Sequence, residues 1–187
     1  MKLPCSVCAY KKGFTLIELL LVIAIIATVS GLAIPTFSRY TKDQSLKQAQ
    51  EVLKSELRSV QNKALVGTGS DSMDASGSRA IVAWGVYTNH GSDVSVVANT
   101  KYRVFMSSYT STGSTGCTDV TRQADIQVLD LPPNITFTNT SCIIFRMEDG
   151  NVSNISESSS IDVNLAGPGG STKTVRITHP GLIRSYN

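Results

Sequence analysis

The sequence has few of the residues from which enzymes build active sites. It contains two histidines, His90 and His179, which stand far apart. It has no H-E-x-x-H metal-binding pattern, no G-x-S-x-G nucleophile pattern and no glycine-rich loop that leads into a helix. The run 167–170 is rich in glycine, but strand-like segments flank it. These absences argue against an enzyme, a metal site, a cofactor and a small-molecule substrate.

Positive charge is scarce once the first residues are set aside. The chain has 17 basic and 14 acidic side chains, which gives a net charge of +3. Three of the basic residues, Lys2, Lys11 and Lys12, precede Gly13, so the remainder is balanced. A balanced chain lacks the basic excess of a typical nucleic-acid-binding domain. A local excess survives at the C-terminal end, where no acidic residue follows Asp162.

One stretch, residues 19–38, has no charge at all. At ~1.5 Å per residue, a helix of this length spans ~30 Å, the thickness of a bilayer's hydrocarbon core. A helix of a soluble protein would carry polar side chains along one face. A secretory signal would end in small residues, whereas here Pro35 and Phe37 are followed by Arg39. The sequence therefore predicts a transmembrane helix over residues 14–40.

The helical pattern continues beyond the uncharged stretch. Apolar residues recur there at steps of three and four: Leu46, Ala49, Leu53, Leu57, Val60 and Ala64. This period of about 3.6 predicts an amphipathic helix over residues 41–66, so that one helix runs from 14 to 66. Pro35 is predicted to kink it, because proline has no N–H to donate. The Gly/Ser-rich segment 67–78 is predicted to end the helix and to act as a linker.

The remainder alternates polar and apolar residues and is rich in β-branched side chains. The candidate strands, separated by Gly, Pro and Asn turn signals, are 79–89, 101–108, 124–131, 135–139, 142–147, 161–165, 172–178 and 182–186. Short strands at close spacing predict an antiparallel sandwich or layered sheets. The expected fold class is therefore α+β, with a long N-terminal helix followed by a β-rich head over residues 67–187.

The four cysteines fall into two pairs. Cys5 and Cys8 form a C-x-x-C pattern, but no second such pattern or nearby histidine completes a metal site, and their role stays open. Cys117 and Cys142 lie in the expected head. A disulfide between them would form in an oxidising compartment and stabilise the fold by about 3 kcal/mol. The alternative is a pair of buried free thiols.

The segment KKGFTLIELLLVIAIIATVSGLAIP, residues 11–35, resembles the class III signal of type IV pilins and of the pseudopilins of type II secretion. The resemblance implies that a prepilin peptidase cleaves between Gly13 and Phe14, removing a leader of residues 1–13, and that the new amine of Phe14 is methylated. It also implies a single-pass protein of the bacterial inner membrane, with its head on the periplasmic or extracellular side.

Glu18 would be the fifth residue of the cleaved chain. A charge inside an apolar helix is unfavourable by about 2.5–3.5 kcal/mol at the centre of a membrane and by less near the interface. The natural partner in a bundle of such helices is the free amine of a neighbouring Phe14, which exists only after cleavage. Glu18 is thus predicted to be an assembly contact with other pilins. The alternative is a carboxylate hydrated among the lipid headgroups.

The C-terminal part resembles minor pilins and pseudopilins of the FimT/GspH type. The resemblance rests on WGVY (84–87), IIFRMEDGNV (143–152), and the glycine-rich run 167–170 followed by TKTVRITHPGLIR. It implies a structural subunit of a type IV pilus or of a type II secretion pseudopilus. It does not distinguish a pilus, a secretion system and a competence system, and it does not give the position within the filament.

A DNA-binding minor pilin of a competence pilus is the alternative function. Some FimT-like pilins bind DNA through a C-terminal Gly-Arg-x-Arg, and the matching residues here read Gly181-Leu182-Ile183-Arg184, without the first arginine. Lys173, Arg176 and Arg184 still make this end of the chain basic. They are either DNA contacts or a solvated surface.

Overall fold

The computed structural model describes residues 13–88, 99–108, 117, 121, 123–153 and 155–186. The chain divides into two compact units, residues 1–40 and 41–187. The head expected over 67–187 therefore also contains the second half of the long helix. Cys5, Cys8 and His90 lie outside the described residues.

A single helix, α1 (Leu16–Leu65), serves both units. It begins two residues later and ends one residue earlier than the sequence predicts. The helix passes through Pro35 without a break in its assignment, and the kink expected there stays a prediction. In the described part of the chain, no helix combines the length and the apolar character that crossing a membrane requires. The span expected over 14–40 accordingly stays a prediction.

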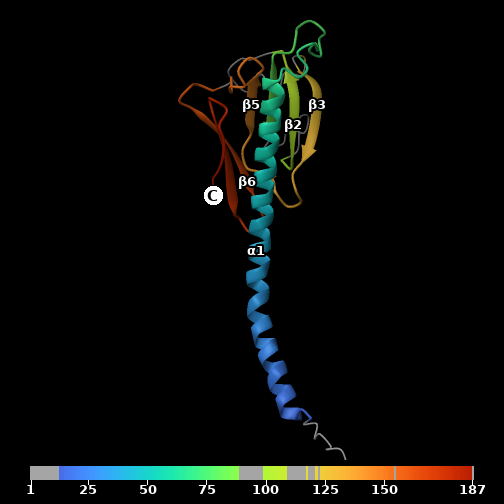
Figure 1. Cartoon of the computed structure of the whole chain (residues 1–187), viewed down its shortest axis with the longest axis vertical. Helices are drawn as coiled ribbons and strands as arrows, with labels where there is room; N and C mark the ends of the chain where they lie inside the picture. Colours follow the sequence, from blue (N-terminus) through green and yellow to red (C-terminus); the bar gives the residue numbers. More distant parts are fainter. Residues whose placement is uncertain are drawn as a thin grey trace, which may run out of the picture. The chain divides into compact units, whose positions relative to one another are not determined.

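The described residues of the second unit form two antiparallel sheets of four strands each (Figure 1). The first has the order β3-β2-β1-β5, and the second has the order β4-β6-β7-β8. The strands are β1 (Ala83–Thr88), β2 (Lys101–Ser107), β3 (Gln123–Asp130), β4 (Thr136–Phe137), β5 (Ser141–Arg146), β6 (Ser160–Ala166), β7 (Thr172–Thr178) and β8 (Ile183–Tyr186). Each overlaps a segment that the sequence predicts as a strand, so the layered α+β architecture is confirmed. The strand expected over 79–89 begins only at Ala83.

The apolar stripe on the second half of α1 forms the centre of the core. All six of its residues are at most 1% exposed: Leu46, Ala49, Leu53, Leu57, Val60 and Ala64. They share one cluster with side chains from both sheets, including Phe137 and Phe145. Figure 1 shows this half of the helix running alongside the sheets. The apolar face predicted from the sequence therefore packs against both sheets and forms part of the core of the head.

One polar residue belongs to this buried surface. Gln50 is only 4% exposed, and its Nε2 donates to the carbonyl oxygens of Thr174 and Tyr186, each at 2.8 Å. These two residues face each other across the β7–β8 pair. Since a buried amide is costly unless it is hydrogen-bonded, Gln50 fixes the position of the last strand against the helix.

Three strands of the first sheet, β1, β2 and β5, are buried on both faces, unlike the half-buried strands that alternation predicts. One face joins the main core, and the other carries a smaller cluster of Ala83, Tyr87, Phe105, Cys117, Cys142 and Ile144. Gly85 is required on this second face. A Cβ built on it would lie 2.3 Å from Cζ of Phe105, its direct partner on β2. The aromatic ring therefore occupies the space that any side chain at this position would need.

The segment expected to be a linker, residues 67–78, is an ordered part of the head. Its Asp74 is 5% exposed, and one carboxylate oxygen accepts from Ser76 Oγ at 2.6 Å and from the Ser78 N–H at 3.2 Å. The other oxygen accepts from Ser108 Oγ at 2.9 Å. The expectation of a linker is wrong, because these hydrogen bonds fold the segment around one carboxylate and tie it to the end of β2.

The Asp74 carboxylate is expected to make the stability of the head sensitive to acid. The hydrogen bond from Ser76, with those from Ser108 and the Ser78 N–H, lowers the pKa of Asp74 from 3.8 to about 2. A lowered pKa in the folded state gives stability that is complete above about pH 4 and is lost as pH falls toward 2. Urea midpoints measured from pH 7 to pH 2 should therefore fall below pH 4. The fall should be smaller in Asp74→Asn, and an equal fall in both proteins would contradict the assignment.

Candidate functional site

The peptide bond between Gly13 and Phe14 lies just before the helix. Residues 13–15 are not helical, and a Cβ built on Gly13 would meet no described atom within 4 Å. Phe14 is 86% exposed. Within the described residues, nothing packs over this bond. A non-helical, uncovered peptide bond that follows glycine can enter a protease site closely, because glycine has no side chain.

The start of α1 is capped by Thr15. The N–H of Glu18 donates to Thr15 Oγ1 at 3.3 Å, and the N–H of Leu19 donates to the Thr15 carbonyl at 3.2 Å. Thr-x-x-Glu is the residue order of a capping box, so the cap could have been found from the residue order alone. The side chain of Glu18 is exposed and lies in the first turn, where the helix dipole favours negative charge.

The helix that follows exposes apolar side chains on every side. They include Leu16, Ile17, Leu19, Leu20, Leu21, Ile23, Ile25, Ile26 and Val29, each between 54% and 76% exposed. A soluble helix would bury one face and expose polar residues on the other. This segment instead has an apolar surface that nothing in its own unit covers, and such a surface is expected to be covered by other molecules.

The chain matches the family defined by the prokaryotic N-terminal methylation motif over residues 8–34. The match supports a type IV pilin-like protein. It covers the leader end, the capped helix start and the exposed apolar segment. No curated protein and no solved structure matches the chain. The match to the motif does not separate one kind of pilin-like protein from another.

For a pilin-like protein, the motif implies processing by a prepilin peptidase and assembly with other pilins. The structure brings Gly13, Phe14 and Glu18 together at one end of α1, with the peptide bond outside the helix and the carboxylate in its first turn. The roles of these three residues in cleavage, methylation and assembly remain predictions.

The three candidate DNA contacts are not equivalent in the structure. Lys173 is 8% exposed on the inner face of β7, and its Nζ lies 3.6 Å from the Asp43 carboxylate on α1. Arg176 forms a two-point contact with Asp162, with Nε and Nη2 at 2.6 and 2.7 Å from its two oxygens. Arg184 is exposed and faces Arg176 across the β7–β8 pair. Two of the three cations therefore already contact carboxylates within the head.

These contacts lower the pKa values of both carboxylates. The pKa of Asp162 is lowered from 3.8, chiefly by the hydrogen bonds from Arg176. The pKa of Asp43 is lowered mainly by the hydrogen bond from Lys47, with Lys173 contributing. DNA binding stays an untested prediction. In the structure, two of the three candidate DNA contacts, Lys173 and Arg176, bind carboxylates of the head instead.

Gly181, the glycine of the tail motif, has a structural role. Its φ is +74°, a conformation that residues with side chains rarely adopt. A Cβ there would lie 2.1 Å from Gln61 Nε2, which itself donates to the Gly150 carbonyl at 3.1 Å. Glycine is therefore required at this position for the last turn to pack against α1, whether or not the tail binds DNA.

Cys117 and Cys142 are joined in a disulfide, and their Cα atoms lie 5.9 Å apart. The bond links a residue of the segment after β2 to the edge strand β5. The sequence suggested this pair, and the structure brings the two residues together. Oxidation of the pair in the exported protein stays a prediction, which a count of free thiols on unreduced protein would test.

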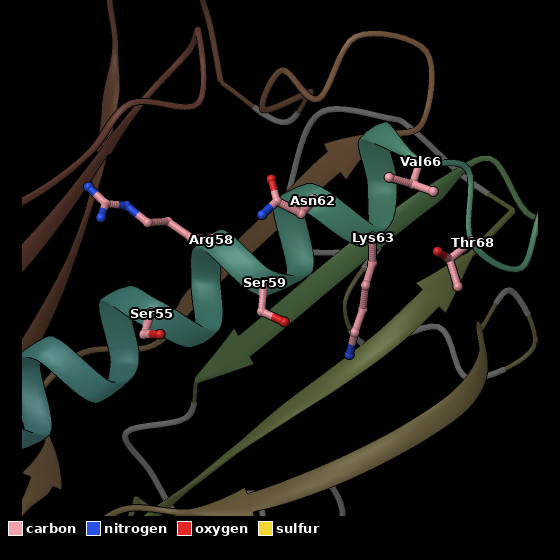
Figure 2. A pocket seen from close by; sticks show the side chains of 7 residues that line it. All are labelled: Ser55, Arg58, Ser59, Asn62, Lys63, Val66 and Thr68. Carbon is pink, nitrogen blue, oxygen red and sulfur yellow. The ribbon is translucent and has the colours of Figure 1, made fainter.

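A polar hollow of about 500 Å³ lies along the second half of α1 (Figure 2). Its lining residues are Ser55, Arg58, Ser59, Asn62, Lys63, Val66 and Thr68. Arg58 and Lys63 extend in different directions from the helix (Figure 2). The Lys63 ammonium lies 5.2 Å from the centre of the Trp84 ring, and Trp84 Nε1 donates to the Thr68 carbonyl at 2.8 Å. These contacts hold the helix end against β1.

Among the residues with described positions, no group of three or more His, Cys, Asp or Glu side chains could hold a metal ion. The features with a recognisable link to function are therefore the N-terminal sequence and the apolar helix that follows it.

Proposed function

We propose that this pilin-like protein is a minor pilin or pseudopilin, a structural subunit of a type IV pilus or of a type II secretion pseudopilus. One observation carries the proposal. The processing sequence Gly13–Glu18 lies at the capped start of a helix that exposes apolar side chains in its first half. The second half of the same helix forms the core of the β-rich head. One element thus carries both an apolar surface for assembly and the folded head.

The position of the cleavage explains how such a subunit is anchored. A cut between Gly13 and Phe14 removes the basic leader but keeps the apolar segment 16–31, which we propose holds the chain in the inner membrane. Cleavage also converts the amide nitrogen of Phe14 into an amine, the group that becomes methylated. The product remains a single-pass protein, with its head on the far side of the membrane, until it enters a filament.

The same cut creates the partner that we propose for Glu18. Before cleavage, the nitrogen of Phe14 is a neutral amide. After cleavage, it is a cation that can contact the Glu18 carboxylate of a neighbouring subunit. A charge-assisted hydrogen bond is roughly twice as strong as a neutral one and is strengthened further in an apolar bundle. Assembly would therefore depend on processing. Contact with DNA is not part of this proposal, because Lys173 and Arg176 already contact carboxylates.

Processing gives the direct test. Mass spectrometry of the membrane-derived protein should show a chain that begins at Phe14 and is one methyl group heavier than the bare sequence. Gly13→Val should retain residues 1–13, because a branched side chain obstructs close approach of the peptide to the protease. Gly31→Val, a matched change within the helix, should be processed normally. A wild-type product that keeps its leader would overturn the proposal.

A further inference from the structure

The second face of the first sheet contains a buried cation. Arg103 lies on β2 and is only 4% exposed. The centre of its guanidinium is 5.6 Å from the ring centre of Tyr87 and 5.3 Å from that of Phe105. Burial lowers its pKa from 12.5. The two rings provide favourable electrostatics, but a buried guanidinium also needs hydrogen-bond acceptors.

The disulfide supplies one of these acceptors. Nη2 of Arg103 donates to the backbone carbonyl of Cys117. Arg103, Tyr87 and Cys142 form one row across β2, β1 and β5, so the disulfide partner of Cys117 lies on the same face two strands away. The bond to Cys142 therefore holds the Cys117 carbonyl above this row. The disulfide is thus the side-chain bond that links Cys117 to the sheet beside Arg103.

One N–H of the Arg103 guanidinium is unsatisfied within the described part of the chain. Its Nε has no hydrogen-bond partner among the described residues. A buried guanidinium that already has one unsatisfied N–H is sensitive to the loss of another acceptor. Hydrogen bonds to charged groups contribute more than neutral ones, and removing one partner leaves the desolvated charge behind.

We propose that the Cys117–Cys142 disulfide and buried Arg103 form one redox-sensitive unit, in which the bond stabilises the head partly by keeping an acceptor on the cation. A dithiol would reduce the bond by donating two electrons and two protons. The Sγ–Sγ bond breaks, Cys117 and Cys142 become thiols, and the dithiol is oxidised to a disulfide. Cys117 is then free to leave, and Arg103 loses this acceptor. Reduction therefore destabilises this face by more than loop closure alone.

A double-mutant cycle on the mature, full-length chain in detergent tests this coupling. The four proteins are wild type, Arg103→Met, the double change Cys117→Ser with Cys142→Ser, and the combination of all three. Unfolding in urea can be followed by the fluorescence of Trp84, the only tryptophan. In the wild-type background, the serine changes should raise the unfolding equilibrium constant several hundred-fold or more, from loop entropy plus the lost acceptor. In the Arg103→Met background, this factor should be at least tenfold smaller.

The same coupling must appear in the redox equilibrium, because linkage is reciprocal. At a fixed ratio of reduced to oxidised dithiol, Arg103→Met should favour the reduced form about tenfold more than wild type does. Arg103→Gln, which keeps N–H donors without the charge, provides the same measurement if the methionine variant does not fold. Arg184→Met, a matched change on the exposed face of β8, should leave both quantities unchanged. Effects that combine additively within about twofold would overturn the proposal.

Discussion

Replacing Glu18 by leucine is expected to leave the protein inserted and cleaved but to reduce its incorporation into filaments by about tenfold or more. The structure separates two roles of this position. Its backbone N–H donates to Thr15 Oγ1, and leucine keeps that N–H. The helix start should therefore persist, with a loss of only about 0.3–1 kcal/mol from the dipole interaction. The proposed contact with a neighbouring amine is lost completely, and such charge-assisted bonds contribute about 1.5–3 kcal/mol.

Fractionation into membrane and sheared or cross-linked filament pools would measure this effect. Glu18→Asp retains the charge but shortens its reach, so an intermediate result is expected. Thr15→Val removes the capping oxygen and leaves the carboxylate in place, which makes it the control for helix fraying. Equal incorporation of Glu18→Leu and wild type would show that the carboxylate is not an assembly contact. A defect in Thr15→Val as large as that of Glu18→Leu would attribute the effect to the cap.

Gly85→Ala is expected to destabilise the head by about 3 kcal/mol or more, although it adds a single methyl group. The added Cβ would lie 2.3, 2.6 and 2.8 Å from three ring atoms of Phe105. Both residues are in the middle of the first sheet, and Gly85 pairs with Ile144 on its other side. The ring therefore has to move within a closely packed cluster, and overpacking of this kind typically costs about 1–3 kcal/mol, occasionally more.

Urea unfolding of Gly85→Ala, followed by Trp84 fluorescence, would measure the loss of unfolding free energy. A rescue variant supplies the control. Phe105→Leu removes the ring atoms nearest to the added methyl group, so the combined variant should be destabilised by less than the sum of the single changes. Strict additivity would contradict the assignment of the cost to the space that the ring occupies.

The helix of the head could be predicted from the sequence because its pattern is local. Steps of three and four identified all six stripe residues, and each is buried. Gln50 was missed although its position gave a signal, since it lies four residues after Leu46 and three before Leu53 on the same face. Its polar side chain suggested an exposed position. The two carbonyl groups that it satisfies lie on β7 and β8, which no local pattern reveals.

The candidate DNA contacts show a second limit of prediction from the sequence. Alternation in β7 places Lys173 on the same face as Val175 and Ile177, so its burial could have been inferred from the period of two. Its contact with Asp43 could not, because that carboxylate lies on α1, far away in the sequence. The bidentate pair of Arg176 and Asp162 likewise depends on the register of β6 against β7. The net charge counted along the C-terminal residues therefore overstated the positive charge that is available to bind DNA.

The order of the 67–78 segment could not be predicted because part of it comes from hydrogen bonds with distant parts of the chain. Ser108 Oγ donates to the buried Asp74 carboxylate, and the Ala75 N–H donates to the Gln123 carbonyl. Ser, Gly and Asp are typical of flexible linkers, and the same residues form compact turns when their side chains meet backbone groups. The candidate processing site was predicted in another way. Gly13, Phe14 and Glu18 were identified by resemblance, while the Thr15 cap that positions them was readable from Thr-x-x-Glu alone.

The hydrogen bonds of Gln50 also have a consequence for the order in which the protein folds. Gln50 and Tyr186 are 136 residues apart in the chain, so the ribosome makes the helix long before the strand that fastens to it. Contacts at such separation form slowly, since a long loop must close before they contribute. The apolar stripe of α1 is consequently uncovered on this side until the last strand has been made. A chain truncated before Ile183 would keep that surface open and would be a natural substrate for chaperones and proteases.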